Sequence, residues 1–182
     1  MARVPEMTAE MLPEAERDLL RRDIALHRAL ANSPGAARAF SGLGQFIRHG
    51  SRLDPRLREL AILQVGWLAR SPYEWSHHVR IGFDFGVSEA DIHALIAETE
   101  GRGSALEPLA RLVLQAAREG YAGGVSAATF ERLRAHLDAE RLVDLVLVIA
   151  FYCAVVRVLA SLDIRVEPDH QPCLDRFPLP PG

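Results

Sequence analysis

The residues best suited to chemistry are two glutamates and a histidine: Glu59, Glu74 and His78. Glu74 and His78 are four positions apart in the run Ser71-Pro-Tyr-Glu-Trp-Ser-His-His78, so on a helix their side chains lie on one face. A carboxylate and an imidazole in contact can share a proton. Glu59 interrupts an apolar helical stripe, where a carboxylate needs a hydrogen-bond partner or a cavity. We predict these three residues as the catalytic group.

The run from Ser71 has a second explanation, which needs no function. Ser71-Pro-Tyr-Glu74 fits a capping box, with serine as the N-cap, proline at the first helical position and a glutamate that reaches back to a backbone amide. Glu74 would then only start a helix, and the protein could be a non-catalytic binding or assembly module. The capping box does not explain His78 or Glu59.

Metal binding is a third interpretation, because a glutamate and a histidine four residues apart can both ligate an ion. A third ligand with suitable spacing is missing. His77 points about 100° away from His78 on a helix, and His93 and His136 have no motif around them. We therefore expect no metal site.

Periodicity, caps and breakers predict an all-α fold with about seven to eight helices in a single domain, residues 1–182. We expect helices over residues 13–22 (possibly extending to 30), 36–48, 55–70, 71–85, 88–99, 106–119, 127–137 and 139–162. Residues 1–12 are expected to form a loose N-terminal arm. Residues 166–182 are expected to form an extended tail, because their prolines cannot continue a helix.

Composition restricts the partners. The chain has 182 residues with 49% hydrophobic and 25% charged side chains, which is typical of a globular domain. A formal net charge of -3 and scattered arginines give no electrostatic footprint for nucleic acid. We expect a small molecule or another subunit as partner.

Compartment and membrane association are predicted from three features. The first residues lack an apolar signal core, and the two cysteines are isolated, so we expect a cytoplasmic protein without disulfides. The apolar run from Leu145 to Val156 lies between Asp144 and Arg157 and is shorter than the roughly 18 to 20 residues that cross a bilayer. We expect this run to be a core or interface helix, with no membrane partner.

About forty residues resemble the carboxymuconolactone decarboxylase and alkylhydroperoxidase D (AhpD-like) superfamily of small all-helical proteins. The similar stretches are Asp54-Pro-Arg-Leu-Arg-Glu-Leu-Ala-Ile-Leu63, Tyr73-Glu-Trp-Ser-His-His-Val-Arg-Ile-Gly82 and Phe85-Gly-Val-Ser-Glu-Ala-Asp-Ile92. The resemblance implies an AhpD-like helical bundle that assembles as a trimer or hexamer.

The two branches of this superfamily differ in their active-site pattern. The peroxidase branch carries a glutamate followed by Cys-x-x-Cys-x-x-x-His, which aligns with Glu59 and His78. Ser71 and Glu74 stand at the two cysteine positions, so a dithiol peroxidase or peroxiredoxin-type antioxidant activity is disfavoured. The decarboxylase branch resembles Glu-x-x-x-His, which Glu74 and His78 match. This resemblance implies cofactor-free decarboxylation, or a related proton transfer, on a small carboxylated lactone or similar anion in aromatic catabolism.

The resemblance also implies roles for individual residues. His78 would be the acid/base, and Glu74 would orient it or relay the proton. Glu59, if buried, would have a raised pKa and act as a neutral donor or as the partner that charges His78. Candidates for contacts with the anionic substrate or the pocket wall are Arg58, Arg80, Tyr73 and Trp75.

Overall fold

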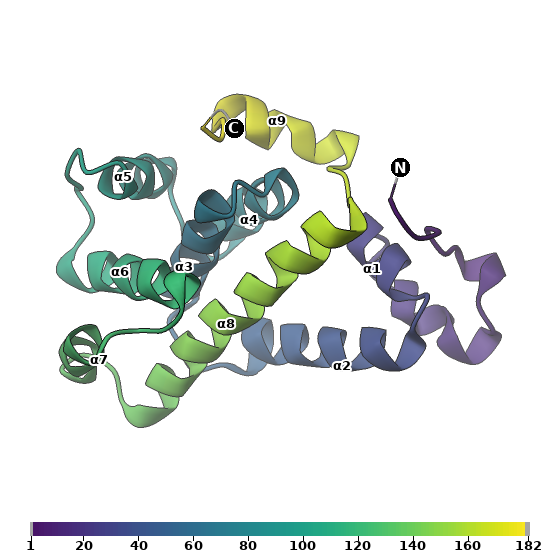
Figure 1. The fold of residues 1–182 in the computed structure, drawn as a ribbon, viewed down its shortest axis with the longest axis horizontal. Coiled ribbons are helices and arrows are strands. Elements are labelled where there is room, and N and C mark those ends of the chain that lie inside the picture. Colours follow the sequence, from purple (N-terminus) through teal and green to yellow (C-terminus); the bar gives the residue numbers. More distant parts are fainter. Residues whose placement is uncertain (1, 181–182) are drawn as a thin grey trace.

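The computed structural model describes residues 2–180, and every regular element in that range is helical (Figure 1). The α-helices are α1 (Ala25–Leu30), α2 (Pro34–Gln45), α3 (Pro55–Leu68), α4 (Pro72–Asp84), α5 (Glu89–Thr99), α6 (Pro108–Ala122), α7 (Ala127–Arg134), α8 (Ala139–Leu162) and α9 (Gln171–Arg176). Four shorter turns are η1 (Ala9–Met11), η2 (Glu14–Leu20), η3 (Phe46–Gly50) and η4 (Pro168–His170). The all-α prediction is confirmed, but residues 2–180 form more helices than the seven to eight expected.

Helix α3 is the centre of the fold. It begins where the sequence predicts, with Pro55 at its first position and the Asp54 carboxylate accepting a hydrogen bond from the Leu57 amide at 3.0 Å. Every residue from Leu57 to Trp67 is buried, because α3 packs against α4, α6 and α8. A helix buried on all sides places Glu59 inside the protein.

A tight turn joins α3 to α4. Arg70 has a φ of 48°, in the left-handed region, and the Ser71 amide donates to the Gly66 carbonyl at 3.0 Å. The Ser71 hydroxyl then accepts from the Glu74 amide at 3.4 Å and caps α4. Because the turn is short, α4 folds back along α3, which brings Glu74 and His78 beside Glu59.

Helix α8 crosses α3 and, within residues 2–180, is the one helix long and apolar enough to span a bilayer by length and composition. Core helices pass the same test. Its Asp144 is buried and accepts hydrogen bonds from the Ser51 hydroxyl at 2.7 Å and the Arg52 amide at 3.0 Å. Helix α8 covers the predicted residues 139–162 and packs against α3, but only 39% of its most apolar window is buried, so the expectation of a core or interface helix stays open between the two.

The sequence suggested a loose N-terminal arm, but in the structure this segment is attached to the rest of the protein by hydrogen bonds. The Arg3 amide donates to the Leu162 carbonyl at 2.8 Å, and the Met7 amide donates to the Arg28 carbonyl at 3.1 Å. Leu12 is buried. The expected helix over residues 13–22 is a 3₁₀ turn, η2, and α1 begins separately at Ala25. Residue 1 lies outside the described residues.

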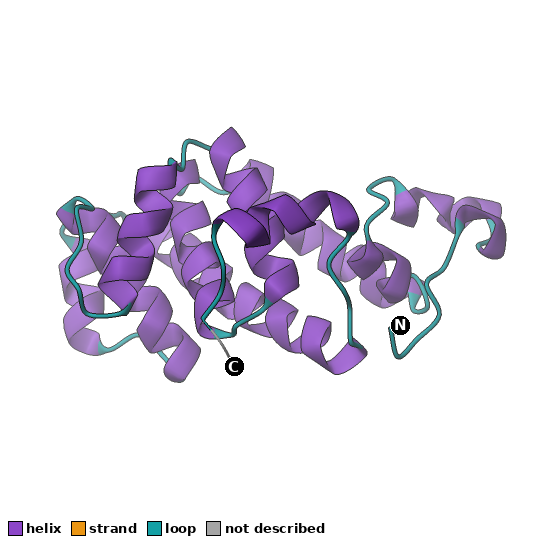
Figure 2. Ribbon diagram, turned by 90° about the horizontal axis from the view of Figure 1, so that it is seen from above, coloured by secondary structure: helices purple, strands orange, loops and turns teal. Residues whose placement is uncertain are grey.

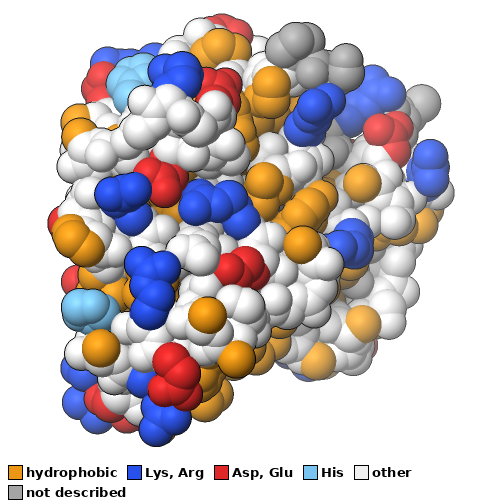
Figure 3. Space-filling model, turned by 60° about the vertical axis from the view of Figure 1, so that its left-hand side comes forward, with side chains coloured by type: hydrophobic (Ala, Val, Ile, Leu, Met, Phe, Trp, Pro, Cys, Tyr) orange, Lys and Arg blue, Asp and Glu red, His pale blue; other side chains and the backbone are white. Residues whose placement is uncertain are grey.

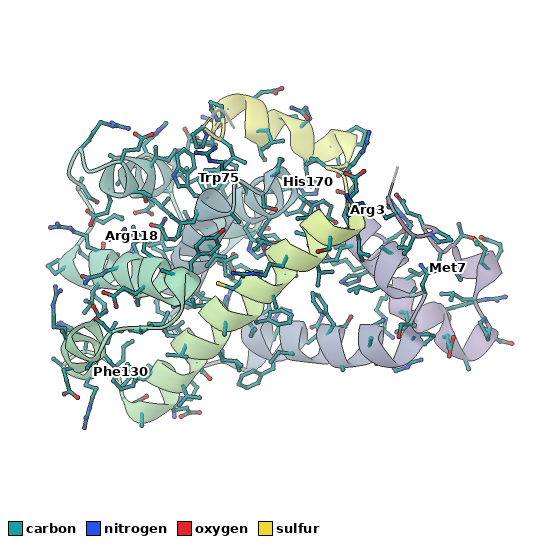
Figure 4. All side chains as sticks on the ribbon, in the orientation of Figure 1. Arg3, Met7, Trp75, Arg118, Phe130 and His170 are labelled. Carbon is teal, nitrogen blue, oxygen red and sulfur yellow. The ribbon has the colours of Figure 1, made fainter. Side chains whose placement is uncertain are left out.

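The C-terminal segment is not extended either. It folds into η4 and α9 and packs on α4, as seen from above in Figure 2. The Trp75 indole donates to the Phe177 carbonyl at 2.7 Å, and the Phe177 side chain is buried. Figure 4 labels Trp75 and His170, one on α4 and the other at the end of η4. The burial of its side chains gives this segment its fold, and the prolines in the sequence could not indicate that burial. Residues 181 and 182 lie outside the described residues.

Charges on the face shown in Figure 3 are mixed, with arginine and acidic side chains next to each other. Ion pairs also join neighbouring helices of the fold. Arg111 on α6 lies 3.1 Å from the Glu98 carboxylate on α5, and Arg56 on α3 lies 2.5 Å from Asp91 on α5. These pairs fix the helices around α3 rather than form a surface of one sign.

Candidate active site

His78 lies between two carboxyl groups in the interior. Its Nδ1 is 2.7 Å from Glu59 Oε2, and its Nε2 is 3.0 Å from Glu74 Oε1. The Arg58 guanidinium extends this row of polar side chains, because its Nε donates to Glu59 Oε1 at 3.0 Å. All four side chains are buried. The structure thus brings Glu59, Glu74 and His78 into contact.

The protonation of Glu59 differs from the sequence-based expectation. Burial opposes its ionisation, but the adjacent His78 and Arg58 outweigh burial and hold the pKa of Glu59 below its ordinary value. The expectation of a raised pKa for Glu59 is therefore wrong. Glu59 is positioned to accept from the Nδ1–H of His78, and in that tautomer Nε2, which faces Glu74, is the remaining proton acceptor of the ring.

Glu74 has the opposite character. Burial raises the pKa of Glu74 above its ordinary value, and the neighbouring Glu59 adds to the rise, although His78 partly offsets it. Glu74 does not complete a capping box, because its carboxyl group turns inward to His78 while the Ser71 amide bonds to Gly66. The capping role that the sequence left open belongs to Ser71 alone.

A partly open cavity lies beside this row of residues. Glu74 and His78 reach it, whereas Glu59 lies behind His78. Aromatic side chains form part of the wall: Phe40 and Phe151 lie 4.8 Å apart, and Tyr152 meets His78 edge-on at 5.0 Å, both measured between ring centroids. The remaining lining residues are Arg22, Ile24, Leu26, His27, Ser41, Gly44, Gln45, Arg48, Tyr73, His77 and Val155.

Of the four predicted substrate contacts, Tyr73 lines the cavity and the other three do not. Arg58 is held inside by Glu59 and lies over the Phe85 ring, 4.4 Å from its centroid. Arg80 is exposed, with its guanidinium 3.5 Å from Asp169. Trp75 is fully buried against α9. Geometry removes Arg58, Arg80 and Trp75 as direct contacts in this cavity.

Sequence reasoning missed Arg22, Arg48 and Tyr152, which line the cavity from three separate segments. Arg22 precedes α1, Arg48 lies in η3 and Tyr152 lies on α8. Burial raises the pKa of the Tyr152 phenol, which keeps it a neutral hydrogen-bond donor. A tyrosine inside the apolar α8 run was the available signal, while the arginines have no motif around them.

His77, which the sequence suggested could face water, is 3% exposed. Its Nε2 lies 2.8 Å from Glu167 Oε2, and its ring is stacked between Tyr73 and His170 at centroid distances of 4.1 and 3.6 Å. The Tyr73 hydroxyl also donates to Glu167, at 3.1 Å. This cluster joins α4 to the C-terminal segment.

Other reactive groups are few among the described residues. Within residues 2–180, no three histidine, cysteine or acidic side chains are arranged to hold a metal ion. The two cysteines are free, Cys153 on α8 and Cys173 on α9, and burial raises the pKa of both thiols. Neither thiol takes the place of the cysteines of the peroxidase pattern, because Ser71 and Glu74 hold those positions.

Residues 34–119 match the carboxymuconolactone decarboxylase family. Among solved structures, the fold is similar to the core of an uncharacterized peroxidase-related AhpD protein from Ralstonia eutropha, with a TM-score of 0.76, 19% identity and coverage of 93% of this chain and 94% of that one. It is also similar to a debrominase in complex with 2,3,4-tribromopyrrole, with a TM-score of 0.78, 19% identity and 96% coverage of both chains.

A third similar structure is a protein of unknown function from Agrobacterium tumefaciens, described as a putative antioxidant defence protein AhpD. Its TM-score is 0.66 at 20% identity, with 76% of this chain and 94% of that chain covered. No curated protein matches the chain in sequence. The structural likenesses establish an AhpD-like fold, and the family match covers Glu59, Glu74 and His78.

Proposed function

Because residues 34–119 match the carboxymuconolactone decarboxylase family and the fold is AhpD-like, we propose that this chain is a member of that family and an enzyme of cofactor-free acid/base chemistry. Its substrate is a small carboxylated lactone or a similar anion. The observation that carries this proposal is His78, held between an ionised Glu59 and a Glu74 whose pKa is raised, at the wall of a cavity. Two carboxyls with opposite protonation around one imidazole suit proton transfer.

Each residue has a distinct part in the proposed reaction. Glu59 fixes the ring of His78 and keeps its proton on Nδ1. Glu74, in its protonated form, is the group that faces substrate with a proton to give. His78 Nε2 accepts a proton from Glu74 or returns one to it, so that Glu74 need not remain an uncompensated buried anion.

In a decarboxylation, this arrangement delivers a proton from the protein to the substrate. Breaking the bond from the lactone carbon to its carboxylate releases carbon dioxide and leaves the electron pair on the substrate as a dienolate. The Glu74 carboxyl donates its proton to that carbon. Nε2 of His78 then takes a proton from water and passes it to the Glu74 carboxylate, which restores the site. The neutral hydroxyl of Tyr152 is available to donate to the enolate oxygen.

Two other functions receive less support. A thiol peroxidase needs a reactive thiolate at the site, whereas Ser71 and Glu74 occupy the family's cysteine positions. A non-catalytic module would leave Glu74 as a helix cap, whereas its carboxyl group faces His78 and the cavity.

The reaction is tested with a carboxylated muconolactone in D₂O, by following carbon dioxide release and deuterium at the carbon that lost its carboxylate. We expect parent protein to release carbon dioxide with one deuterium incorporated, and His78→Gln and Glu74→Gln to lose about 10²- to 10⁴-fold in rate. Unchanged rates in both variants would contradict the proposal. Absence of turnover by the parent, with Glu74→Gln altering only thermal stability, would favour the non-catalytic module.

A further inference from the structure

Two arginines beside the proton-transfer residues have no partner in the protein. Among residues 2–180, the arginines whose guanidinium makes neither a hydrogen bond nor an ion pair are Arg21, Arg22, Arg48 and Arg70. Arg21 and Arg70 are exposed to water, which satisfies them. Arg22 and Arg48 are half-buried, and both line the cavity that Glu74 and His78 reach.

The charges around the cavity do not cancel. Arg58 is neutralised by its direct contact with Glu59, and Glu74 is biased toward its neutral form by burial. Arg22 and Arg48 therefore remain as positive charges. They also repel each other: burial and the neighbouring Arg48 lower the pKa of Arg22. A local excess of positive charge stands in a protein whose formal net charge is -3.

Half-buried like charges without partners are unfavourable unless an anion joins them. Guanidinium groups present a planar set of donors that matches the two oxygens of a carboxylate. Other anion sources within the protein are excluded by position, because the acidic groups that face the cavity are limited to Glu74, and neither arginine contacts it. The missing anion must come from solution.

The uncharged residues of the cavity wall indicate the chemistry of the rest of the ligand. Phe40, Phe151 and Tyr152 supply rings, and Ile24, Leu26 and Val155 supply aliphatic groups. Such a wall favours a flat, largely apolar ring with one charged end rather than inorganic phosphate or a flexible polar acid. Helices α1, α2 and α8, which carry all of these residues except Ile24, are labelled in Figure 1.

We propose that Arg22 and Arg48 bind the carboxylate of a small cyclic organic acid and hold its ring against Phe151 and Tyr152, with the reacting carbon toward Glu74. This inference rests on the proposed function and deepens it by assigning the residues that determine specificity. Arg22, Phe151 and Tyr152 lie outside residues 34–119, the part that matches the family, whereas Glu59, Glu74 and His78 lie inside it. The family-matched part holds the proton-transfer residues and Arg48, and the flanking segments supply Arg22, Phe151 and Tyr152.

Binding is measured apart from turnover with two probes of nearly equal shape, 4-fluorobenzoate and 4-fluorobenzamide, by ¹⁹F NMR titration. We expect the parent protein to bind the benzoate at least about tenfold more tightly than the benzamide, as a charge-assisted pair predicts. Arg22→Met and Arg48→Met should each weaken benzoate about tenfold and leave benzamide unchanged. Arg22→Lys should restore part of the loss, because it retains the charge without the planar fork.

Arg80→Met is the matched control, since it removes an exposed arginine outside the cavity and should leave both probes unaffected. A second readout is thermal stability, because removing one of two repelling guanidiniums should keep or raise the unfolding temperature, whereas loss of a structural arginine would lower it. Equal affinity of the parent for both probes, no binding of either, or full benzoate binding by the double variant of Arg22 and Arg48 would overturn the proposal.

Failure of this inference is distinguishable from failure of the proposed reaction. Glu74→Gln and His78→Gln should keep benzoate binding while they lose proton transfer. If benzoate binding depends on Arg22 and Arg48 but the lactone is not consumed, the anion site stands without the reaction. If the lactone is turned over and Arg22→Met leaves KM unchanged, the reaction stands without the anion site.

Discussion

His77 and His78 are adjacent on α4 and almost equally buried, at 3% and 5% exposure, yet they have different kinds of partner. His77 bonds to Glu167, a carboxylate that also accepts from the Tyr73 hydroxyl and from the Ala25 amide at 2.7 Å. His78 lies between Glu59 and Glu74: its Nδ1 is hydrogen-bonded to Glu59, whereas Glu74 Oε1 lies 3.0 Å from its Nε2 without a hydrogen bond to any residue in 2–180.

The two carboxylate partners differ in how many hydrogen bonds they already accept. Glu167 accepts from one donor on α1 and two on α4, so the His77 cluster holds α1, α4 and the C-terminal segment together. The Glu74 carboxyl lines the cavity, and its Oε1, which lies 3.0 Å from His78 Nε2, makes no hydrogen bond within residues 2–180. A buried carboxyl with unused hydrogen-bonding capacity can exchange a proton with a ligand, whereas a fully bonded one stabilises the fold.

The largest expected effect separates the two histidines by activity. His78→Gln should reduce the rate of proton transfer about 10²- to 10⁴-fold, because it removes the acceptor at Nε2. His77→Gln should keep the rate within a few-fold of the parent. Steady-state turnover of the lactone measures both, and equal losses in the two variants would erase the functional distinction between them.

The two glutamates around His78 should differ in stability. Glu59→Gln leaves Arg58 without its buried counter-ion and should cost about 3–5 kcal/mol of unfolding free energy. Glu74→Gln replaces a carboxyl biased toward neutrality with a neutral amide of similar shape, so we expect a change below about 1 kcal/mol. Urea unfolding at neutral pH compares them. A larger loss for Glu74→Gln would reverse the assigned protonation states.

Removing Glu167 tests the structural cluster. Glu167→Ala leaves His77, Tyr73 and the Ala25 amide without their acceptor, which should lower the free energy of unfolding by about 2–3 kcal/mol. Anion binding at Arg22 and Arg48 should survive, provided that it is measured well below the unfolding temperature. If Glu167→Ala instead removed activity at unchanged stability, the His77 cluster would belong to the active site.

The smallest expected effect is a pH dependence that comes from His77. Burial lowers the pKa of His77 to about 4, with His170 adding to the shift and Glu167 opposing it, while the unfolded value is 6.5. Between these values the unfolded chain binds more protons, so this contribution is complete above pH 6.5 and is lost as pH falls toward 4. The stability difference between parent and His77→Gln should therefore shrink from pH 7 to pH 5. A constant difference would contradict a neutral, buried His77.

Local signals in the sequence predicted much of the scaffold. Asp54-Pro55 and Ser71-Pro72 mark the starts of α3 and α4, because capping and proline at the first position act within one turn. The family pattern indicated that Glu59 and His78 belong together, and in the structure their side chains are in contact at 2.7 Å. Their catalytic role stays a prediction, as do the trimer or hexamer, the cytoplasmic location and the absence of a membrane partner.

Features that depend on distant contacts were not predictable. Prolines suggested an extended tail, but the burial of Phe177 and the bond from Trp75 order it. The pKa of Glu59 was expected to be raised because burial was visible in the pattern, whereas its contact with Arg58 and His78 was not. Arg22 and Arg48 come together only in the folded chain, so no spacing marks them.

The central claim is that the pKa values of the two carboxyls on either side of His78 are shifted in opposite directions, and it can be measured without a substrate. A ¹³C NMR titration of protein labelled at the glutamate carboxyl carbons, with Glu59→Gln and Glu74→Gln for assignment, follows both groups. We predict that Glu59 titrates below the ordinary glutamate value of 4.5 and that Glu74 titrates above it. The reverse order, or two midpoints that match those of the exposed glutamates, would contradict the account.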